Sequence, residues 1–394
     1  MGSEMTQKER MKAALTGKEA DRIPVAPDIS FMVPCKLTGK PFADVLLRNN
    51  PPLWKAYIDA VDYYDFDGWF TYSDIMHVEK REYTVRKEEK TDSDGNIYVT
   101  QIIDTPKGEL KQVTYYPPDN SDTPVEKYVK DFKEDIPKLK YLFPYIDKLD
   151  TSVYDEQVKA FGDRGIMAVN IFPPGMHIFF SYVNGMDILS YAYYDYPEIF
   201  EEFTELYTNY QMRRLELILD LKPDSILTGG SGSITLASPS MWDKITFPVI
   251  KKITKWCKEA GVISGIHSCG KEMHIIKRCA EETCLDYINP IEIPPMGDSD
   301  LATAKKLYGD KISLMGNLHT TDIMLNGTVN DVRRESLRAI LDAGIGGGFC
   351  LSTGDQAGRD TPEENLRAMI ETCKKFGTYP LNVDKIKEEL RLLQ

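Results

Sequence analysis

Short apolar runs alternate with amphipathic stretches along most of this chain. Continuous apolar runs of this kind are typical of parallel strands that are buried on both faces. The runs are residues 23–27, 67–72, 166–172, 225–228, 262–267, 286–289, 312–315 and 348–351. Because helix-like stretches separate most of them, the pattern predicts an α/β fold. We expect a single domain, residues 1–394, that closes into a (β/α)8 TIM barrel.

The helix-like stretches carry their own start signals. Thr6 followed by Glu9 is a capping box, and Thr361 followed by Glu364 is a second one after the last strand. Between them, residues 197–221 place apolar side chains at helical spacing. These side chains are Ile199, Phe203, Leu206 and Tyr210. Such stripes predict helices that pack one face against a sheet.

The pattern changes over about residues 78–118. Residues 98–103 are β-rich, and Asp94-Gly95 before them is a turn signal between two strands. We therefore predict a β-hairpin insertion in the N-terminal third rather than a separate domain.

A doubly wound open sheet would also alternate strands and helices. A dinucleotide-binding sheet of that class carries a glycine-rich turn between a strand and a helix. Gly346-Gly347-Gly348 instead precedes a strand, where it is typical of a tight turn. The barrel is the favoured interpretation.

Composition narrows the function classes. The net charge is −13, which argues against a nucleic-acid partner because such a partner requires a basic face. No apolar run is long enough to cross a membrane. The seven cysteines occur without a secretory signal, which favours a reducing, cytoplasmic setting with thiols buried or bound to metal.

The segment His267-Ser268-Cys269-Gly270 ends one of the apolar runs. Side chains two positions apart at a strand end point to the same side, so His267 and Cys269 are expected to converge above the barrel. An imidazole and a thiolate together suit zinc. The alternative is a buried histidine beside an inert core cysteine. Cys350, in the last strand, is a candidate third ligand.

Other polar residues follow predicted strands at the same face, which is where barrels place their active sites. They are Ser73, Asp74, Asn289, Glu292, Asn317, Thr353 and Asp355. His177 follows the third strand, and Asp28 follows the first. Each could equally be an ordinary loop residue or a helix cap.

Several segments together resemble the uroporphyrinogen decarboxylase superfamily, whose fold is a (β/α)8 barrel. The segments are residues 16–25, 72–75, 236–239, 267–270, 289–292, 316–317, 360–365 and 376–380. True decarboxylases of this superfamily carry an arginine-rich segment after strand one that binds substrate carboxylates. Residues 26–35 contain no arginine, although Asp74 matches the decarboxylase aspartate. Porphyrinogen decarboxylation is therefore disfavoured, and a decarboxylase of a smaller acid stays an alternative.

The other branch of the superfamily contains zinc-dependent, corrinoid-linked methyltransferases with a similar His-x-Cys motif. The resemblance implies zinc, a corrinoid carried by a partner protein, and a small methyl donor or acceptor such as a methoxylated compound or a thiol. The third cysteine of that branch falls nearer Ser352 or Thr353 than Cys350. Either Cys350, Asp355 or Glu292 is the third ligand, or the site binds metal weakly or not at all.

The resemblance also suggests roles for the remaining residues. Asp74 and Glu292 are the expected catalytic acid or anchor, and Asn317, His177 and Asp28 the expected substrate contacts. A homodimer is possible. A non-catalytic barrel that binds a cobamide or tetrapyrrole is the second alternative.

Overall fold

Seven parallel strands form the central sheet of the protein, which is seen here in a computed structural model that describes residues 4–73 and 75–393. The order across the sheet is β1-β8-β9-β10-β11-β12-β13. The strands are β1 (Gly68–Phe70), β8 (Gly165–Asn170), β9 (Ser225–Gly229), β10 (Ile263–His267), β11 (Tyr287–Asn289), β12 (Ser313–Leu318) and β13 (Phe349–Thr353). Each lies on an apolar run that the sequence predicted, because a parallel strand is covered on both faces.

Residues 23–27, the expected first strand, close the ring. Val25 forms a parallel bridge with Leu351 of β13, and the Ala26 N–H donates to the Leu351 carbonyl over 2.9 Å. On the other side, the Asp67 N–H donates to the Val25 carbonyl over 2.9 Å. The segment is an isolated bridge rather than a regular strand, yet it joins both edges of the sheet. The predicted (β/α)8 barrel is confirmed.

Large side chains fill the barrel interior. Trp69, Tyr287 and Met315 share one buried cluster with Met11 and Leu15 of the first helix, α1 (Gln7–Leu15). α1 therefore closes the end of the barrel where the strands begin. Its predicted capping box is present.

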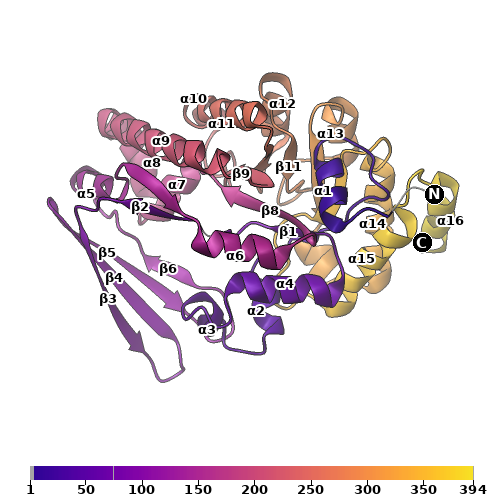
Figure 1. The fold of residues 1–394 in the computed structure, drawn as a ribbon, viewed down its shortest axis with the longest axis horizontal. Helices are drawn as coiled ribbons and strands as arrows, with labels where there is room; N and C mark the ends of the chain where they lie inside the picture. Colours follow the sequence, from indigo (N-terminus) through magenta and orange to yellow (C-terminus); the bar gives the residue numbers. More distant parts are fainter. Residues whose placement is uncertain (1–3, 74, 394) are drawn as a thin grey trace.

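The other helices surround the barrel or connect its strands (Figure 1). They are α2 (Met32–Leu37), α3 (Phe42–Leu46), α4 (Leu53–Tyr64), α5 (Phe132–Leu139), α6 (Ser152–Phe161), α7 (Met176–Tyr182), α8 (Met186–Asp195), α9 (Pro197–Leu219), α10 (Pro239–Ile245), α11 (Phe247–Ala260), α12 (Met273–Glu282), α13 (Leu301–Tyr308), α14 (Val329–Ala343), α15 (Glu363–Phe376) and α16 (Val383–Leu392). Two short helical turns, η1 (Lys140–Leu142) and η2 (Thr320–Leu325), complete the set.

Two local predictions about helices are wrong. α9 buries Phe200, Phe203 and Tyr207, so its buried face is rotated from the predicted stripe, of which only Phe203 is fully buried. α15 begins after Pro362 without a side-chain cap, so the capping box predicted at Thr361 does not form. Phe132 of α5 and Phe179 of α7 stack on Phe200 of α9, and the periodicity of α9 alone does not encode this packing.

The β-rich insertion is larger than the predicted hairpin. β3 (Thr84–Thr91), β4 (Ile97–Thr105), β5 (Gly108–Tyr116) and β6 (Thr123–Glu126) form a four-stranded antiparallel sheet. β2 (Met76–Glu79) pairs separately with β7 (Ile146–Asp150). The four-stranded sheet lies to one side of the barrel in Figure 1, and its Ile103 and Leu110 pack against α5.

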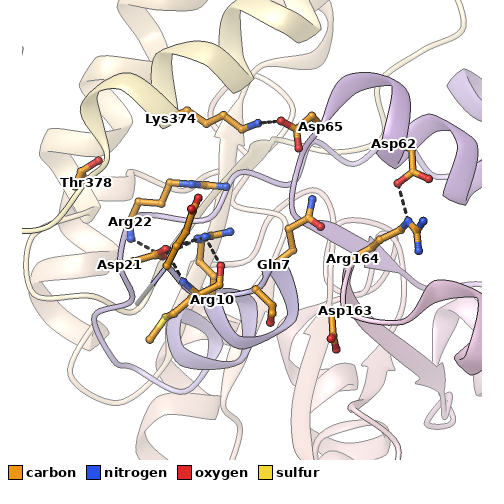
Figure 2. Close-up of a pocket in the computed structure, with 13 residues that line it drawn as sticks. Gln7, Arg10, Asp21, Arg22, Asp62, Asp65, Asp163, Arg164, Lys374 and Thr378 are labelled. Atoms are coloured by element: carbon orange, nitrogen blue, oxygen red, sulfur yellow. Dashed lines mark hydrogen bonds and ion pairs between the residues drawn. The ribbon is translucent and has the colours of Figure 1, made fainter. Parts of the chain in front are cut away.

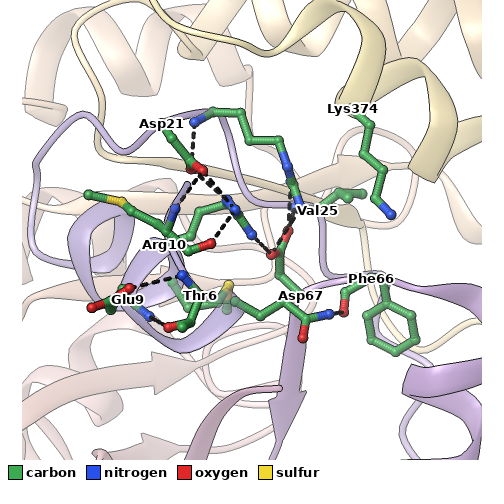
Figure 3. A network of polar contacts seen from close by, with 12 residues as sticks. Thr6, Glu9, Arg10, Asp21, Val25, Phe66, Asp67 and Lys374 are labelled. Atoms are coloured by element: carbon green, nitrogen blue, oxygen red, sulfur yellow. Dashed lines mark hydrogen bonds and ion pairs between the residues drawn. The ribbon is translucent and has the colours of Figure 1, made fainter. Parts of the chain in front are cut away.

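An ion network lies where the strands begin, beside α1. Asp67 is fully buried, and both Arg10 and Arg22 bind its carboxylate (Figure 3). A polar hollow of about 950 Å³ opens next to this network, and Figure 2 shows further ion pairs around it, including that of Asp62 with Arg164. No helix within the described ranges is long and apolar enough to cross a membrane.

Candidate active site

The carboxyl end of β10 carries the His-x-Cys segment. His267 is the last residue of β10 and is paired in register with Asn289 of β11. Gly270 follows Cys269 with φ +91°, a conformation that residues with a side chain rarely adopt. A Cβ at Gly270 would also lie 2.2 Å from the Thr235 Oγ1. Glycine is therefore required for the tight turn directly after Cys269.

Three possible metal ligands meet at the barrel mouth. An imidazole nitrogen of His267, the Cys269 Sγ and a carboxylate oxygen of Asp355 all lie within 4.8 Å of one another. All three residues are partly buried, and Asp355 comes from the loop after β13. Within residues 4–73 and 75–393 this is the only such group of three. Nitrogen, sulfur and oxygen donors are the set that zinc takes in proteins, so the residues present fit that ion.

A neighbouring amide fixes the orientation of the imidazole. The His267 Nδ1 lies 2.9 Å from the Asn289 Oδ1, which can only accept a hydrogen bond. The proton of a neutral His267 therefore sits on Nδ1 and leaves Nε2 as the donor atom for a metal. Nε2 faces the Ser231 Oγ at 3.4 Å.

Opposing influences act on the pKa of His267. Burial, the largest of them, lowers it. The hydrogen bond and the negative charge of Cys269, followed by the charge of Asp355, outweigh burial and raise the pKa to about 9. The site without metal thus attracts positive charge, which is the electrostatic condition for binding a cation.

Two buried carboxyl groups support the turn after Cys269. The Gly270 N–H donates to the Glu292 Oε2, and the Glu292 N–H donates to the Glu272 Oε1 over 2.5 Å. Burial raises the pKa of Glu292 and raises that of Glu272 well above its usual value. Glu292 therefore lies beside the possible metal ligands, and Glu272 lies behind Glu292.

Asp28 lies on the other side of the mouth. Its backbone N–H donates to the Thr353 Oγ1 over 3.0 Å, and the Ser30 hydroxyl donates to its Oδ1. Burial, together with the charge of Asp355, raises the pKa of Asp28 to about 6. The structure thus brings Asp28 toward the same centre as Asp355.

Residues 179–376 match the profile of the uroporphyrinogen decarboxylase (URO-D) family. This segment is half of the chain and contains His267, Cys269 and Asp355. The chain belongs to the uroporphyrinogen decarboxylase family.

Curated relatives of this family member include two kinds of enzyme. The methylcobamide:CoM methyltransferase MtbA of Methanosarcina mazei is 29% identical over 149 residues, which are 37% of this chain and 40% of that protein. A uroporphyrinogen decarboxylase of Legionella pneumophila is 38% identical over 77 residues, 20% of this chain and 21% of that protein. The match therefore spans about two fifths of the methyltransferase and about one fifth of the decarboxylase.

A solved structure described as a methyltransferase from Methanosarcina mazei shares the fold. It aligns with 95% of this chain and 99% of its own at a TM-score of 0.64, with 16% identity. The likeness shows that the barrel of this URO-D family member extends over nearly the whole chain.

Cys350 does not lie with His267, Cys269 and Asp355 at the barrel mouth. It is fully buried in the interior cluster, and its Sγ lies 3.9 Å from the Met11 Sδ of α1. Within β13 its side chain points into the barrel at the depth of α1, below the mouth. The expectation that Cys350 joins His267 and Cys269 is corrected: Asp355, one of the alternatives, holds that position.

The remaining expected site residues are spread around the mouth. His177, on α7, lies with its ring centroid 5.3 Å from that of Phe172, and burial followed by the charge of His267 lowers its pKa. Asn317 lies in β12 opposite Ser352 of β13. Asp74 lies outside the described residues.

Sequence reasoning missed two residues of this site. Glu272, at the start of α12, has no pattern that separates it from an ordinary helix-capping acid. Ser231 lies in a loop, and only the folded chain brings it to the imidazole. Asn289 was noted only for its place after a strand, a signal that does not reveal its bond to His267.

Proposed function

We propose that this chain is a zinc-dependent methyltransferase. It moves a methyl group between a small substrate, a methoxylated compound or a thiol, and a corrinoid cofactor on a partner protein. The observation that carries the proposal is the convergence of His267, Cys269 and Asp355 at the open end of the barrel. The names of the Methanosarcina relatives support a methyl-transfer reaction that involves a cobamide.

His267, Cys269 and Asp355 would hold the zinc ion, and Asn289 keeps the imidazole in the tautomer that binds through Nε2. Bound zinc would supply Lewis acidity toward a thiol or an ether oxygen of the substrate. With these three protein ligands, a zinc ion would keep a position free for the substrate, as catalytic zinc sites do.

Two carboxyl groups lie where they can exchange protons with the substrate. When the bond to the methyl group breaks, the leaving oxygen or sulfur keeps the electron pair and can take a proton. Glu292 and Asp28 both have pKa values raised by burial, so each holds a proton at a higher pH than an exposed carboxyl does. We assign the general acid to Glu292, because it adjoins the Cys269 turn, and a substrate contact to Asp28.

The residues of the site give little support to the alternative that the protein is a decarboxylase. The loop of residues 26–35 has no arginine, and its Asp28 adds a carboxyl group where the decarboxylases bind substrate carboxylates. A poly-acid substrate would leave its own charges unpaired there. We also propose a corrinoid protein as partner, a homodimer and a cytoplasmic setting. The setting agrees with the cysteines, because all seven lie in the described part of the chain and are free thiols.

A spectral assay of corrinoid methylation tests the function. The purified protein, a corrinoid and candidate methoxylated compounds or thiols are mixed, and the Co(I) and methyl-Co(III) bands are followed. We expect transfer by the wild type and by Cys284→Ala, whose thiol is exposed and far from the ligand set in the structure. Cys269→Ala and His267→Ala should lose at least about 100-fold in rate. Full activity in both of these variants would refute the proposal.

A further inference from the structure

Glu272 is a buried carboxyl group that the proposed mechanism does not use. It is fully buried at the start of α12, where an acidic side chain usually caps the helix. Here Asp298 supplies the cap instead. Its Oδ1 accepts from the N–H groups of Glu272 and Met273 over 2.7 Å and 3.1 Å. The position of Glu272 at a helix start therefore does not explain its carboxyl group.

The carboxyl of Glu272 binds the chain that follows β11. Its Oε1 accepts from the Glu292 N–H over 2.5 Å. The Glu292 side chain reaches the turn after β10, where its Oε2 accepts from the Gly270 N–H. Because Gly270 directly follows Cys269, two hydrogen bonds in series join Glu272 to the turn that carries Cys269.

The loop of residues 292–299 holds Glu292 from its other side. The Ser299 N–H donates to the Glu292 carbonyl over 3.1 Å. A Cβ added at Gly297 would lie 2.2 Å from that carbonyl oxygen, so the loop closes on Glu292 only with glycine there. Glu292 itself is 7% exposed, so its N–H has little access to water and depends on Glu272 for an acceptor.

Glu272 performs this task without a charge. Burial raises its pKa well above the ordinary value, and the negative charges of Glu292 and Asp298 act in the same direction. The hydrogen bond from the Glu292 N–H opposes them and does not outweigh them. Glu272 therefore keeps its proton at neutral pH. Glutamine has nearly the same shape and the same acceptor oxygen, so it should be able to replace it.

We propose that Glu272 is a positioning residue. Its carboxyl holds the backbone of Glu292, and the Glu292 side chain in turn holds the turn that carries Cys269. The roles of Cys269 as a zinc ligand and of Glu292 as the general acid rest on the proposed function, whereas the positioning of the turn does not.

Alkylation of the thiols in metal-free protein tests this positioning. Iodoacetamide is added in the presence of a chelator, and mass spectrometry measures the modification of each cysteine. Cys269 is partly buried, the exposed Cys284 serves as the reference, and the buried Cys279 reports on the packing of α12. Glu272→Ala should raise the reactivity of Cys269 about tenfold relative to Cys284, because a released turn opens more often. Cys279 should stay protected.

Three further variants identify the cause of the change. Glu272→Gln keeps the acceptor oxygen and should react as the wild type does. Glu272→Asp keeps the acid but is too short to reach the Glu292 N–H, so it should resemble Glu272→Ala. Because aspartate suits a helix start, this variant also serves if the alanine variant does not fold. Glu281→Ala, at an exposed site on α12, is the matched control and should leave Cys269 unchanged.

The outcomes separate this proposal from the proposed function. Unchanged reactivity of Cys269 in both Glu272→Ala and Glu272→Asp, or an equal rise in Glu272→Gln, would overturn the positioning role. A joint rise at Cys269 and Cys279 would overturn it as well, since Glu272 would then hold only α12. A protein that transfers no methyl group but shows the expected pattern at Cys269 would instead defeat the proposed function alone.

Discussion

Asp28 shows how burial changes a single carboxyl group at the barrel mouth. It is 6% exposed, and its pKa is raised to about 6. An acid whose pKa is higher in the folded than in the unfolded state binds more protons when folded. The stability that Asp28 contributes is fully present below the pKa of its carboxyl in the unfolded state. It is lost as the pH rises through the pKa of that carboxyl in the folded state.

We therefore predict that Asp28→Asn flattens part of the pH dependence of stability. From about pH 4 to about pH 7 the wild type should lose roughly 2 kcal/mol of unfolding free energy that the variant retains. Urea unfolding with a chelator present measures this difference. Asp59→Asn, an exposed site on α4, is the control and should track the wild type. A constant difference between Asp28→Asn and wild type over this range would contradict the prediction.

At the scale of elements, α1 is fastened to the barrel by the buried Asp67. Its carboxylate accepts from Arg10 at 2.7 Å and from Arg22 at 2.8 Å, and also from the Val25 N–H at 2.9 Å. It therefore ties together α1, the closing segment of residues 23–27 and the start of β1. Removing one partner of a buried ion pair leaves the other charges uncompensated.

Asp67→Asn should destabilise the fold by about 3 kcal/mol because two arginines lose their counter-charge. Asp62→Asn provides the comparison: Asp62 pairs with Arg164 at 2.6 Å, but their side chains are 52% and 36% exposed. That exposed pair should contribute less than about 1 kcal/mol. Chemical unfolding of both variants gives the loss of unfolding free energy in each. Equal losses would show that Asp67 does not anchor α1.

The elements that the sequence revealed were those with a local cause. The barrel strands are apolar because both faces are covered, and the Thr6 capping box acts within one turn. Most of the errors concern long-range packing, although the local capping box predicted at Thr361 also fails to form. The buried face of α9 depends on the rings of α5 and α7, and the place of Asp355 depends on how the loop after β13 returns to the mouth. Cys350 has the right element and chemistry but lies too deep, which spacing alone does not show.

At the scale of the whole molecule, the two ends of the barrel differ: one is closed by packing, and the other carries the candidate site. Buried ion pairs and α1 close the end where the strands begin. The opposite end gathers donors from β10 and from the loop after β13, which only closure of the ring brings together. The inserted sheet extends this end sideways and forms one wall of a cavity of about 710 Å³ whose other wall comes from α7 and α9.

The central claim is that the side chains of His267, Cys269 and Asp355 hold a zinc ion. Mass spectrometry of the metal content of purified protein tests it most directly. We predict about one zinc per chain in the wild type and in Cys350→Ala, and strong loss in His267→Ala, Cys269→Ala and Asp355→Ala. A wild type without zinc after expression with zinc supplied, or full zinc in the His267 and Cys269 variants, would contradict the account.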